Sequence, residues 1–490
     1  MNLSPQRPIF NRRPETNVYR LFFMSIISLG GIWLIIQMNQ GQIRSPFATA
    51  PTPTRNSNSY AMEGDAQFTA GSLDKSIAAY QEAVRVDPNN AQAWAELARI
   101  QAYSTSLLTT DAETKARLNE ALQSAQEAVK LAPDDSTAHA VLAFTLDWNA
   151  NPSLLDDAQI QALLTKADLE AVRALQLDSS NTLAMAYYAE ILVDEQKWTQ
   201  AEQYIKQAVD RDPSLMDVHR VYAYVLEALG EYNLAIQEYD KAIAITPKLT
   251  FLYLRAGANY RQLGFKSLNS DTQKQLFDSS LEYFAKAASI NNELQVKDPV
   301  PYLSIAKTYS QEGEYFIAAR NVQKALDFQP SNADIYGQLG IIYFKSRNYE
   351  GSIPALQCAV RGCSGDNSCI GRGLTACDDQ NPAVQVVGLP LSLSTVDYYQ
   401  VYFSVLAALG PRNPTVYCPE ALNIIAKVKA SGFESNRPDI TSNITAAELE
   451  CSSSPTGGNT SATATPIATQ KLLATSTPFP TDTPVPTSTP

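Results

Sequence analysis

Two patterns of apolar residues divide the 490-residue chain. An uncharged apolar run extends from Leu21 to Ile36 without helical periodicity, whereas from about residue 57 onward apolar residues recur at helical spacing. Counted from Tyr19 to Met38, the first segment has 20 residues, enough to span about 30 Å of hydrocarbon as a helix. The pattern predicts one membrane-spanning helix followed by a long region of amphipathic helices.

Charged residues flank the apolar run unequally. The basic residues before it are Arg7, Arg12, Arg13 and Arg20. Glu15 is the one acid before the run, and only Arg44 follows it closely. Because positively charged flanks stay in the cytoplasm, the sequence predicts a cytoplasmic basic segment (1–20), a signal anchor (21–38) and a linker (39–56). The sequence further predicts that the chain contacts the membrane through Leu21–Ile36 and that the bulk of the chain is extracytoplasmic.

A cleaved signal peptide is the alternative interpretation of this segment. Ala48-Thr49-Ala50 provides the small residues of a cleavage site. The long basic segment, the length of the apolar run and Pro51 directly after the cut favour a retained anchor.

A pattern of about 20 residues recurs in the helical region. A turn residue is followed by an aromatic, a small residue, a bulky residue, alanine and proline, most clearly in residues 71–90, 196–215, 230–249 and 313–332. The recurring alanines are Ala83, Ala128, Ala174, Ala208, Ala242, Ala287, Ala325 and Ala359, at intervals of 45, 46, 34, 34, 45, 38 and 34 residues. The prolines that stop the second helix are Pro88, Pro133, Pro213, Pro247 and Pro330.

The residues upstream of each pattern agree with it. An aromatic residue or histidine precedes an aliphatic residue or tyrosine and then a small residue, as in Trp94-Leu97-Ala98, His219-Tyr222-Ala223, Tyr302-Ile305-Ala306 and Tyr336-Leu339-Gly340. Small residues let two antiparallel helices approach closely, and the larger ones fill the volume between them. The sequence therefore predicts repeated helix pairs.

This 34-residue period resembles the tetratricopeptide repeat (TPR) family. The resemblance implies an all-α fold, a right-handed TPR α-solenoid of about eight to nine helix pairs, with the array over residues 57–360. One transmembrane helix precedes the array. Residues 361–450 are expected to form a Cys-rich loop and a divergent C-terminal helical repeat. The Thr/Ser/Pro-rich residues 451–490 cannot bury a core and are expected to be a disordered tail.

Three intervals exceed 34 residues by 11 or 12, after Gln101, Leu146 and Gly264. Since that excess is close to three helical turns, we expect elongated helices or an extra short helix there. A ninth, divergent unit at 396–430 keeps helical spacing and is expected to cap the array.

All six cysteines lie late in the chain, at Cys358, Cys363, Cys369, Cys377, Cys418 and Cys451. An even number outside the reducing cytosol predicts disulfides, which would order a polar loop over 362–390. The spacing does not decide the pairing. A zinc site is the alternative, and it is disfavoured because no CxxC pair and no nearby histidine are present.

The composition excludes several function classes. Lys and Arg total 38 against 50 Asp and Glu, a formal net charge of −12, so no basic surface for nucleic acid is expected. His139 and His219 are the only histidines, and each stands where other repeats have an aromatic packing residue. No motif of a serine hydrolase, zinc protease, P-loop or dinucleotide-binding protein occurs in the sequence. The sequence predicts no enzyme activity, no metal and no cofactor.

With these function classes excluded, the sequence favours a protein that binds a partner on its surface. In TPR proteins, first-helix residues on the concave side hold a peptide or a partner helix, so the resemblance implies a scaffold that binds a protein or peptide. Carried over by alignment, the candidates are Phe68, Tyr103, Phe144, Trp148, Glu190, Asp194, Arg220, Tyr224, Leu254, Arg261, Lys307 and Phe344. The family's Lys/Asn clamp for C-terminal carboxylates is not reproduced, because Glu190 and Tyr224 stand where its asparagines would be. The alternative function is a surface-exposed hydrolase or a carbohydrate-active, ligand-binding protein with its site in the Cys-rich region.

Overall fold

The computed structural model describes residues 17–39, 55–413 and 415–452. The chain divides into two compact units, Met1–Arg55 and Asn56–Pro490. Most of the predicted basic segment, most of the linker and nearly all of the Thr/Ser/Pro-rich tail lie outside the described residues.

The first unit contains helix α1 (Val18–Asn39). Its Val18–Gln37 stretch of 20 residues has a mean hydropathy of 1.8, and its large apolar side chains are exposed. The predicted span at 21–38 therefore corresponds to a helix long and apolar enough to cross a membrane. Its orientation stays a prediction.

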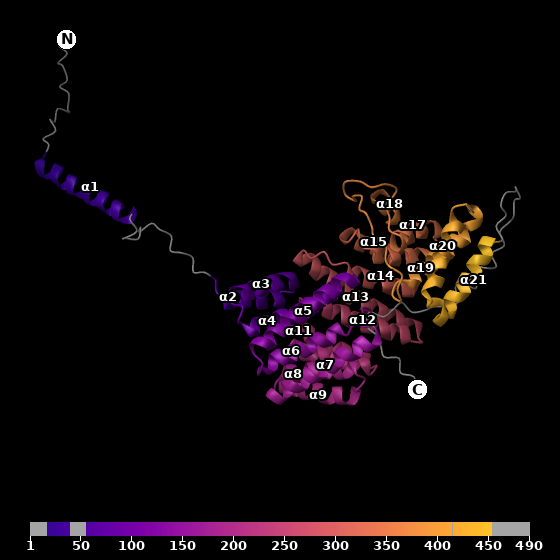
Figure 1. Ribbon diagram of the computed structural model, residues 1–490, viewed down its shortest axis with the longest axis horizontal. Helices are drawn as coiled ribbons and strands as arrows, with labels where there is room; N and C mark the ends of the chain where they lie inside the picture. The colour runs from indigo at the N-terminus through magenta and orange to yellow at the C-terminus, as the bar shows by residue number, and fades with distance from the viewer. Residues whose placement is uncertain (1–16, 40–54, 414, 453–490) are drawn as a thin grey trace, which may run out of the picture. The chain divides into compact units, whose positions relative to one another are not determined.

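The second unit is an array of helical hairpins (Figure 1). Within the described residues there are nine pairs: α2 (Ser57–Thr69) with α3 (Leu73–Val86), α4 (Ala91–Ser104) with α5 (Asp111–Leu131), α6 (Ser136–Asn149) with α7 (Asp157–Leu177), α8 (Thr182–Asp194) with α9 (Trp198–Arg211), α10 (Met216–Ala228) with α11 (Tyr232–Ile245), α12 (Thr250–Lys266) with α13 (Ser270–Leu294), α14 (Val300–Glu312) with α15 (Tyr315–Phe328), α16 (Ala333–Lys345) with α17 (Tyr349–Val360), and α19 (Val396–Leu409) with α20 (Tyr417–Ser431). The predicted all-α solenoid of about eight to nine pairs is confirmed.

The recurring alanines hold the two helices of each pair together. All eight of them are completely buried. Carbonyls of this set also accept the backbone N–H at the end of the second helix, for example Asp87 N–H to Ala83 O and Asp212 N–H to Ala208 O, both at 3.0 Å. Proline follows that capping residue at Pro88 and Pro213, where the helix has ended.

The aromatic or histidine residue of the first helix fixes the turn before it. Trp94, His139, His219, Tyr253 and Tyr336 each reach back six residues to a proline carbonyl, at 2.9–3.0 Å. The bond ties the start of one pair to the end of the previous pair. The two histidines therefore pack in the first helix, as expected, and in addition make a hydrogen bond to the turn before it.

The three long intervals contain long helices. Helices α5 and α7 have 21 residues each, and α13 has 25. A short 3-10 helix, η1 (Thr105–Leu107), also follows α4. Elongated helices and an extra short helix, the two features expected in the long intervals, therefore both occur.

The array coils far enough for early repeats to contact late ones. Thr109, before α5, donates a hydrogen bond to Gln329, after α15, at 2.6 Å. Gly71 adopts φ +78° and lies against the backbone of Lys248, where a Cβ would come within 2.1 Å of the carbonyl oxygen. The first helices α4 and α10 consequently face each other across the inside of the coil, as the contacts of the next subsection show.

The C-terminal region contains more order than the sequence predicts. Helix α18 (Gly365–Gly371) lies within the Cys-rich loop, which is also joined by an isolated β-bridge between Cys363 and Val386. The expected ninth pair, α19 and α20, is followed by the 3-10 helix η3 (Phe433–Asn436) and by α21 (Pro438–Ser452). Helix α21 buries Ile440, Ile444 and Ala447 and packs on α19. The last described helix thus runs two residues past the predicted start of the tail at 451.

Candidate functional site

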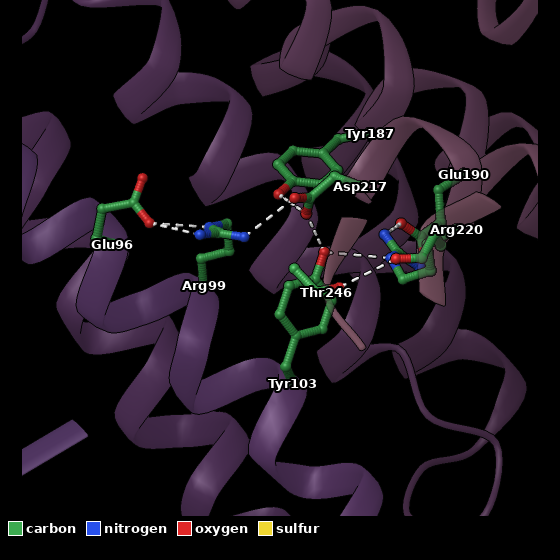
Figure 2. A network of polar contacts seen from close by, with 9 residues as sticks. Glu96, Arg99, Tyr103, Tyr187, Glu190, Asp217, Arg220 and Thr246 are labelled. Atoms are coloured by element: carbon green, nitrogen blue, oxygen red, sulfur yellow. Dashed lines mark hydrogen bonds and ion pairs between the residues drawn. The ribbon is translucent and has the colours of Figure 1, made fainter. Parts of the chain in front are cut away.

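We call the side of the first helices that faces the inside of the coil the inner face. Asp217 of α10 is a buried carboxylate on this face and lies among Arg99, Tyr103 and Tyr187 (Figure 2). Arg99 of α4 donates to its Oδ2 at 3.1 Å, and Tyr187 of α8 donates to its Oδ1 at 2.7 Å. The hydroxyl of Tyr103, also from α4, donates to Oδ1 as well. Burial alone would raise the pKa of Asp217, but Arg99, Arg220 and the two tyrosine hydroxyls hold it below the usual range. Asp217 is therefore a stable anion that joins three repeats.

An ion pair between Glu190 of α8 and Arg220 of α10 lies beside Asp217 (Figure 2). Arg220 donates through Nη1 to Oε1 at 2.7 Å and through Nη2 to Oε2 at 2.6 Å, a bidentate geometry. Trp148 of α6 donates to the same carboxylate at 3.1 Å. The side chains of Arg220 and Glu190 are only 7% and 6% exposed. Both charges are satisfied within the protein.

Aromatic rings fill the space around these charges. Phe144 stacks on Tyr187 with ring centres 4.5 Å apart, and Tyr103 stacks on Phe251 of α12 at 5.3 Å. The guanidinium of Arg220 lies 5.2 Å from the centre of the Tyr103 ring. Together they form a packed interior for the coil, built from α4, α6, α8, α10 and α12.

A second carboxylate pair differs from this interior. Asp147 of α6 is 4% exposed, whereas Asp194, at the end of α8, is exposed. The two carboxyls face each other, and Tyr224 of α10 donates to Oδ1 of Asp194 at 2.5 Å. Burial, then the charges of Asp194 and Glu190, raise the pKa of Asp147 well above its usual value. Desolvation of its carboxyl likewise raises the pKa of Asp194, to about 7, although the residue as a whole is exposed.

A further ion pair continues the polar surface beyond Tyr224. Arg255 of α12 contacts Glu227 of α10, and Asn259 donates to the same carboxylate. The Arg255 guanidinium also lies 5.8 Å from the centre of the Tyr224 ring. Since Tyr224, Glu227 and Arg255 are partly exposed, the inner face becomes accessible at this point.

The six cysteines form three disulfides, Cys358–Cys363, Cys369–Cys377 and Cys418–Cys451. The first joins α17 to the residues just before α18, the second joins α18 to the loop that follows it, and the third joins α20 to α21. A cavity of about 360 Å³ beside α18 is lined by Asp327 and Arg372. The Arg372 guanidinium is already engaged there, donating to the Pro382 carbonyl at 2.7 Å.

No three His, Cys, Asp or Glu side chains are placed to hold a metal ion among residues 17–39, 55–413 and 415–452. His139 and His219 have carboxylate partners, Glu170 and Glu238, each at 2.6 Å. Because each imidazole has both nitrogens engaged, neither is placed as a free acid or base.

Two stretches of the chain match known protein families. Residues 64–102 match the family described as TPR repeat, and residues 182–250 match the one described as Tetratricopeptide repeat. This chain is a TPR protein.

Solved structures with a similar fold include the thermophilic TPR protein TTC0263 of Thermus thermophilus. It is 18% identical, the match covers 41% of this chain and 98% of that one, and the TM-score is 0.34. A human IFIT1 dimer with PPP-AAAA is 16% identical over 82% of this chain and 91% of that one, with a TM-score of 0.50. The human IFIT1 dimer with m7Gppp-AAAA is also 16% identical, over 81% and 91%, with a TM-score of 0.48. At these identities the likeness concerns the fold alone.

The TPR array places the twelve predicted partner-binding residues in different surroundings. Those buried in the interior are Phe68, Tyr103, Phe144, Glu190, Arg220, Leu254 and Arg261. Those with some exposure are Trp148, Asp194, Tyr224, Lys307 and Phe344. The buried side chains are therefore part of the packing of the coil, and only the five partly or fully exposed ones are accessible from solvent.

Alignment of the TPR units did not point to Arg99, Asp147, Tyr187, Asp217 or Arg255. The available signal was a charged residue on the otherwise apolar first helix of a pair, as at Arg99 and Asp147. That signal does not say which residues meet, because Arg99 and Asp217 are 118 positions apart and come together only through the coiling of the array.

Proposed function

We propose that this TPR protein is a membrane-anchored, exported scaffold that binds a protein or peptide partner on the accessible part of its inner face, at Trp148, Asp194 and Tyr224. The observation that carries the proposal is the contrast along that face. Its centre is filled by the protein's own ion pairs and aromatic rings, and beyond them polar and aromatic side chains remain open to solvent.

Anchoring is supported by α1. Apolar side chains such as Phe22, Phe23 and Leu29 are more than 60% exposed. A soluble protein rarely leaves 20 successive residues of this kind in water, whereas a bilayer would bury them. Export is supported by the three disulfides, since such bonds persist in oxidising compartments.

Nucleic acid is a weaker candidate for the partner. One of the human IFIT1 structures holds PPP-AAAA. In this chain Arg99, Arg220 and Arg255 of the inner face are each paired with a carboxylate, and the net charge is −12. A phosphate backbone would meet an excess of negative charge.

A hydrolase site in the Cys-rich region is also less well supported. The cavity there offers Asp327 and Arg372, and Arg372 is held by the Pro382 carbonyl and the Cys369 sulfur. Among the residues that line it, no nucleophile is paired with a base.

The test is made on intact cells with the full chain carrying a tag. Alkaline extraction should leave the protein with the membrane, protease added outside should remove the region after residue 56, and cross-linking should capture a stoichiometric protein. The matched control is Leu29→Arg with Ile32→Arg, because two charges in mid-helix cost about 5–7 kcal/mol of insertion. Retention of the control in the membrane, or capture of no protein by the wild type, contradicts the proposal.

A further inference from the structure

The charges on the inner face are not all paired in the same way. Asp217 has Arg99, Glu190 has Arg220, and Glu227 has Arg255. Asp147 and Asp194, by contrast, take part in no ion pair with any of the described Lys, Arg or His residues. Two carboxyls are therefore held together without a cation between them.

Asp147 has an unmet hydrogen-bonding requirement as well. Its Oδ1 is inaccessible to water and has no donor among the described residues. Once Asp147 is ionised, this buried oxygen without a donor costs free energy that a ligand with N–H groups would recover. Asp194, the carboxyl that faces Asp147, belongs to an exposed residue, and its own Oδ1 already accepts from Tyr224.

Two aromatic side chains lie near the pair. Tyr224 of α10 donates to Asp194, and Trp148 of α6 donates to Glu190, whose charge acts on both carboxyls. Both aromatic residues are partly exposed. The face of such a ring attracts an ammonium or guanidinium group. Arg220 lies 5.9 Å from the Trp148 ring and Arg255 lies 5.8 Å from the Tyr224 ring, but each arginine is neutralised by its own glutamate.

We propose that the Asp147–Asp194 pair is a recognition site for a basic side chain, the ammonium of lysine or the guanidinium of arginine, presented by the protein or peptide partner. The inference rests on the proposed function, and it names the chemistry of the partner. A basic side chain supplies the N–H donor that Asp147 Oδ1 lacks and the positive charge that the pair lacks. A divalent metal is the less suitable occupant, because calcium takes six to eight oxygen ligands and no three acidic, histidine or cysteine side chains among the described residues are placed to hold an ion.

When no basic side chain is bound, the Asp147–Asp194 pair holds a proton. The groups that face the pair are Glu190, Arg220, Tyr224 and Arg255. Since the two carboxyls lie in contact and Arg220 and Arg255 serve other anions, one carboxyl retains its proton near neutral pH, as in other closely spaced acid pairs. Entry of a basic side chain displaces this proton, so binding and proton release are coupled.

The experiment is a titration of the full chain, solubilised in detergent, with an acetylated and amidated tetralysine peptide as the probe. The corresponding tetraglutamate peptide is the control of opposite charge. Calorimetry is carried out at pH 7 in phosphate and in Tris, two buffers with different ionisation enthalpies, at 150 mM salt. The variant is Asp147→Asn with Asp194→Asn, which keeps the shape of the side chains. The matched control is Asp74→Asn with Asp134→Asn, two carboxyls whose side chains are 88% exposed, so that both double variants lose the same charge.

We expect the tetralysine peptide to bind the wild type and the control equally and the Asp147/Asp194 variant at least tenfold more weakly. The wild type should release protons on binding and the variant should not. No binding of the tetralysine peptide to the wild type, binding of the tetraglutamate peptide with equal affinity, equal weakening in both double variants, or binding without proton release overturns the inference.

Two further readouts separate the site from the fold and from the scaffold. Circular dichroism melting of both double variants distinguishes loss of the site from loss of the fold. If the cell experiment captures a partner while the tetralysine peptide fails, the scaffold stands and the cation site falls. If the tetralysine peptide binds but the cell experiment captures no partner, the cation site stands and the scaffold falls.

Discussion

The ion pair between Glu190 and Arg220 allows a direct test of the interior. Replacing Arg220 with Met keeps an unbranched apolar side chain at this position and removes the guanidinium with its charge. Glu190 is then a buried carboxylate with Trp148 as its one remaining donor, at 3.1 Å. Breaking a buried pair by removing one partner costs about 3–5 kcal/mol, whereas replacing both partners with apolar residues is often close to neutral. We therefore expect Arg220→Met to be strongly destabilising and the double variant with Glu190→Met to regain at least about 2 kcal/mol of that loss.

Hydrogen exchange of α8 and α10 is the suitable assay, because repeat arrays open in parts and a single unfolding midpoint would average over them. The matched control is Arg173→Met, which removes a cation from an ion pair with Asp134 whose side chains are 45% and 88% exposed. An exposed pair contributes about 0–1 kcal/mol, so the control should change little. If Arg220→Met costs no more than Arg173→Met, or if the two interior substitutions simply add, the pair does not hold the coil together.

Three further outcomes are expected. Burial raises the pKa of Asp147 and, to about 7, that of Asp194, so the folded protein binds more protons than the unfolded chain between about pH 4 and 7. Stability should consequently fall as pH rises through this window. The urea midpoint of the Asp147→Asn, Asp194→Asn variant should fall less than that of the wild type over the same pH range. An equal fall of the two midpoints would contradict a proton held by the pair. Reduction should loosen α20 and α21 first, since the Cys418–Cys451 bond closes a loop of 33 residues that is worth about 4 kcal/mol, and hydrogen exchange with reductant should leave α2 to α11 unchanged. Gly340→Ala places a Cβ 2.4 Å from Leu356 Cγ and should lower the free energy of unfolding by about 1–3 kcal/mol, measured by thermal unfolding. In the control Gly230→Ala the new Cβ meets no atom within 4 Å, so this variant measures only the cost of a side chain at φ +78°.

The helix pairs could be predicted because their determinants are local. Ala208 and Ala242 lie 34 residues apart and occupy the same buried position in successive units. Pro213 and Pro247 mark where the second helices of these two units end. The long intervals were interpretable for the same reason, since helix length follows directly from residue number.

The interior could not be predicted, because it depends on how far each pair rotates against the next. A small rotation repeated over several pairs decides whether Tyr103 meets Asp217 or faces solvent. No repeat pattern pointed to α21, whose three buried residues, Ile440, Ile444 and Ala447, stand among polar ones and pack on α19. The pairing of the cysteines was open because it depends on the position of α18 in a loop without a repeat pattern.

The most direct test of the scaffold is site-specific photo-cross-linking in living cells. A benzophenone amino acid is placed in the full chain either at Tyr224, on the accessible inner face, or at Leu169, which is 64% exposed on α7. Our account predicts one discrete cross-linked protein from position 224 and none from position 169. Equal products from both positions, or no product from position 224, would contradict it.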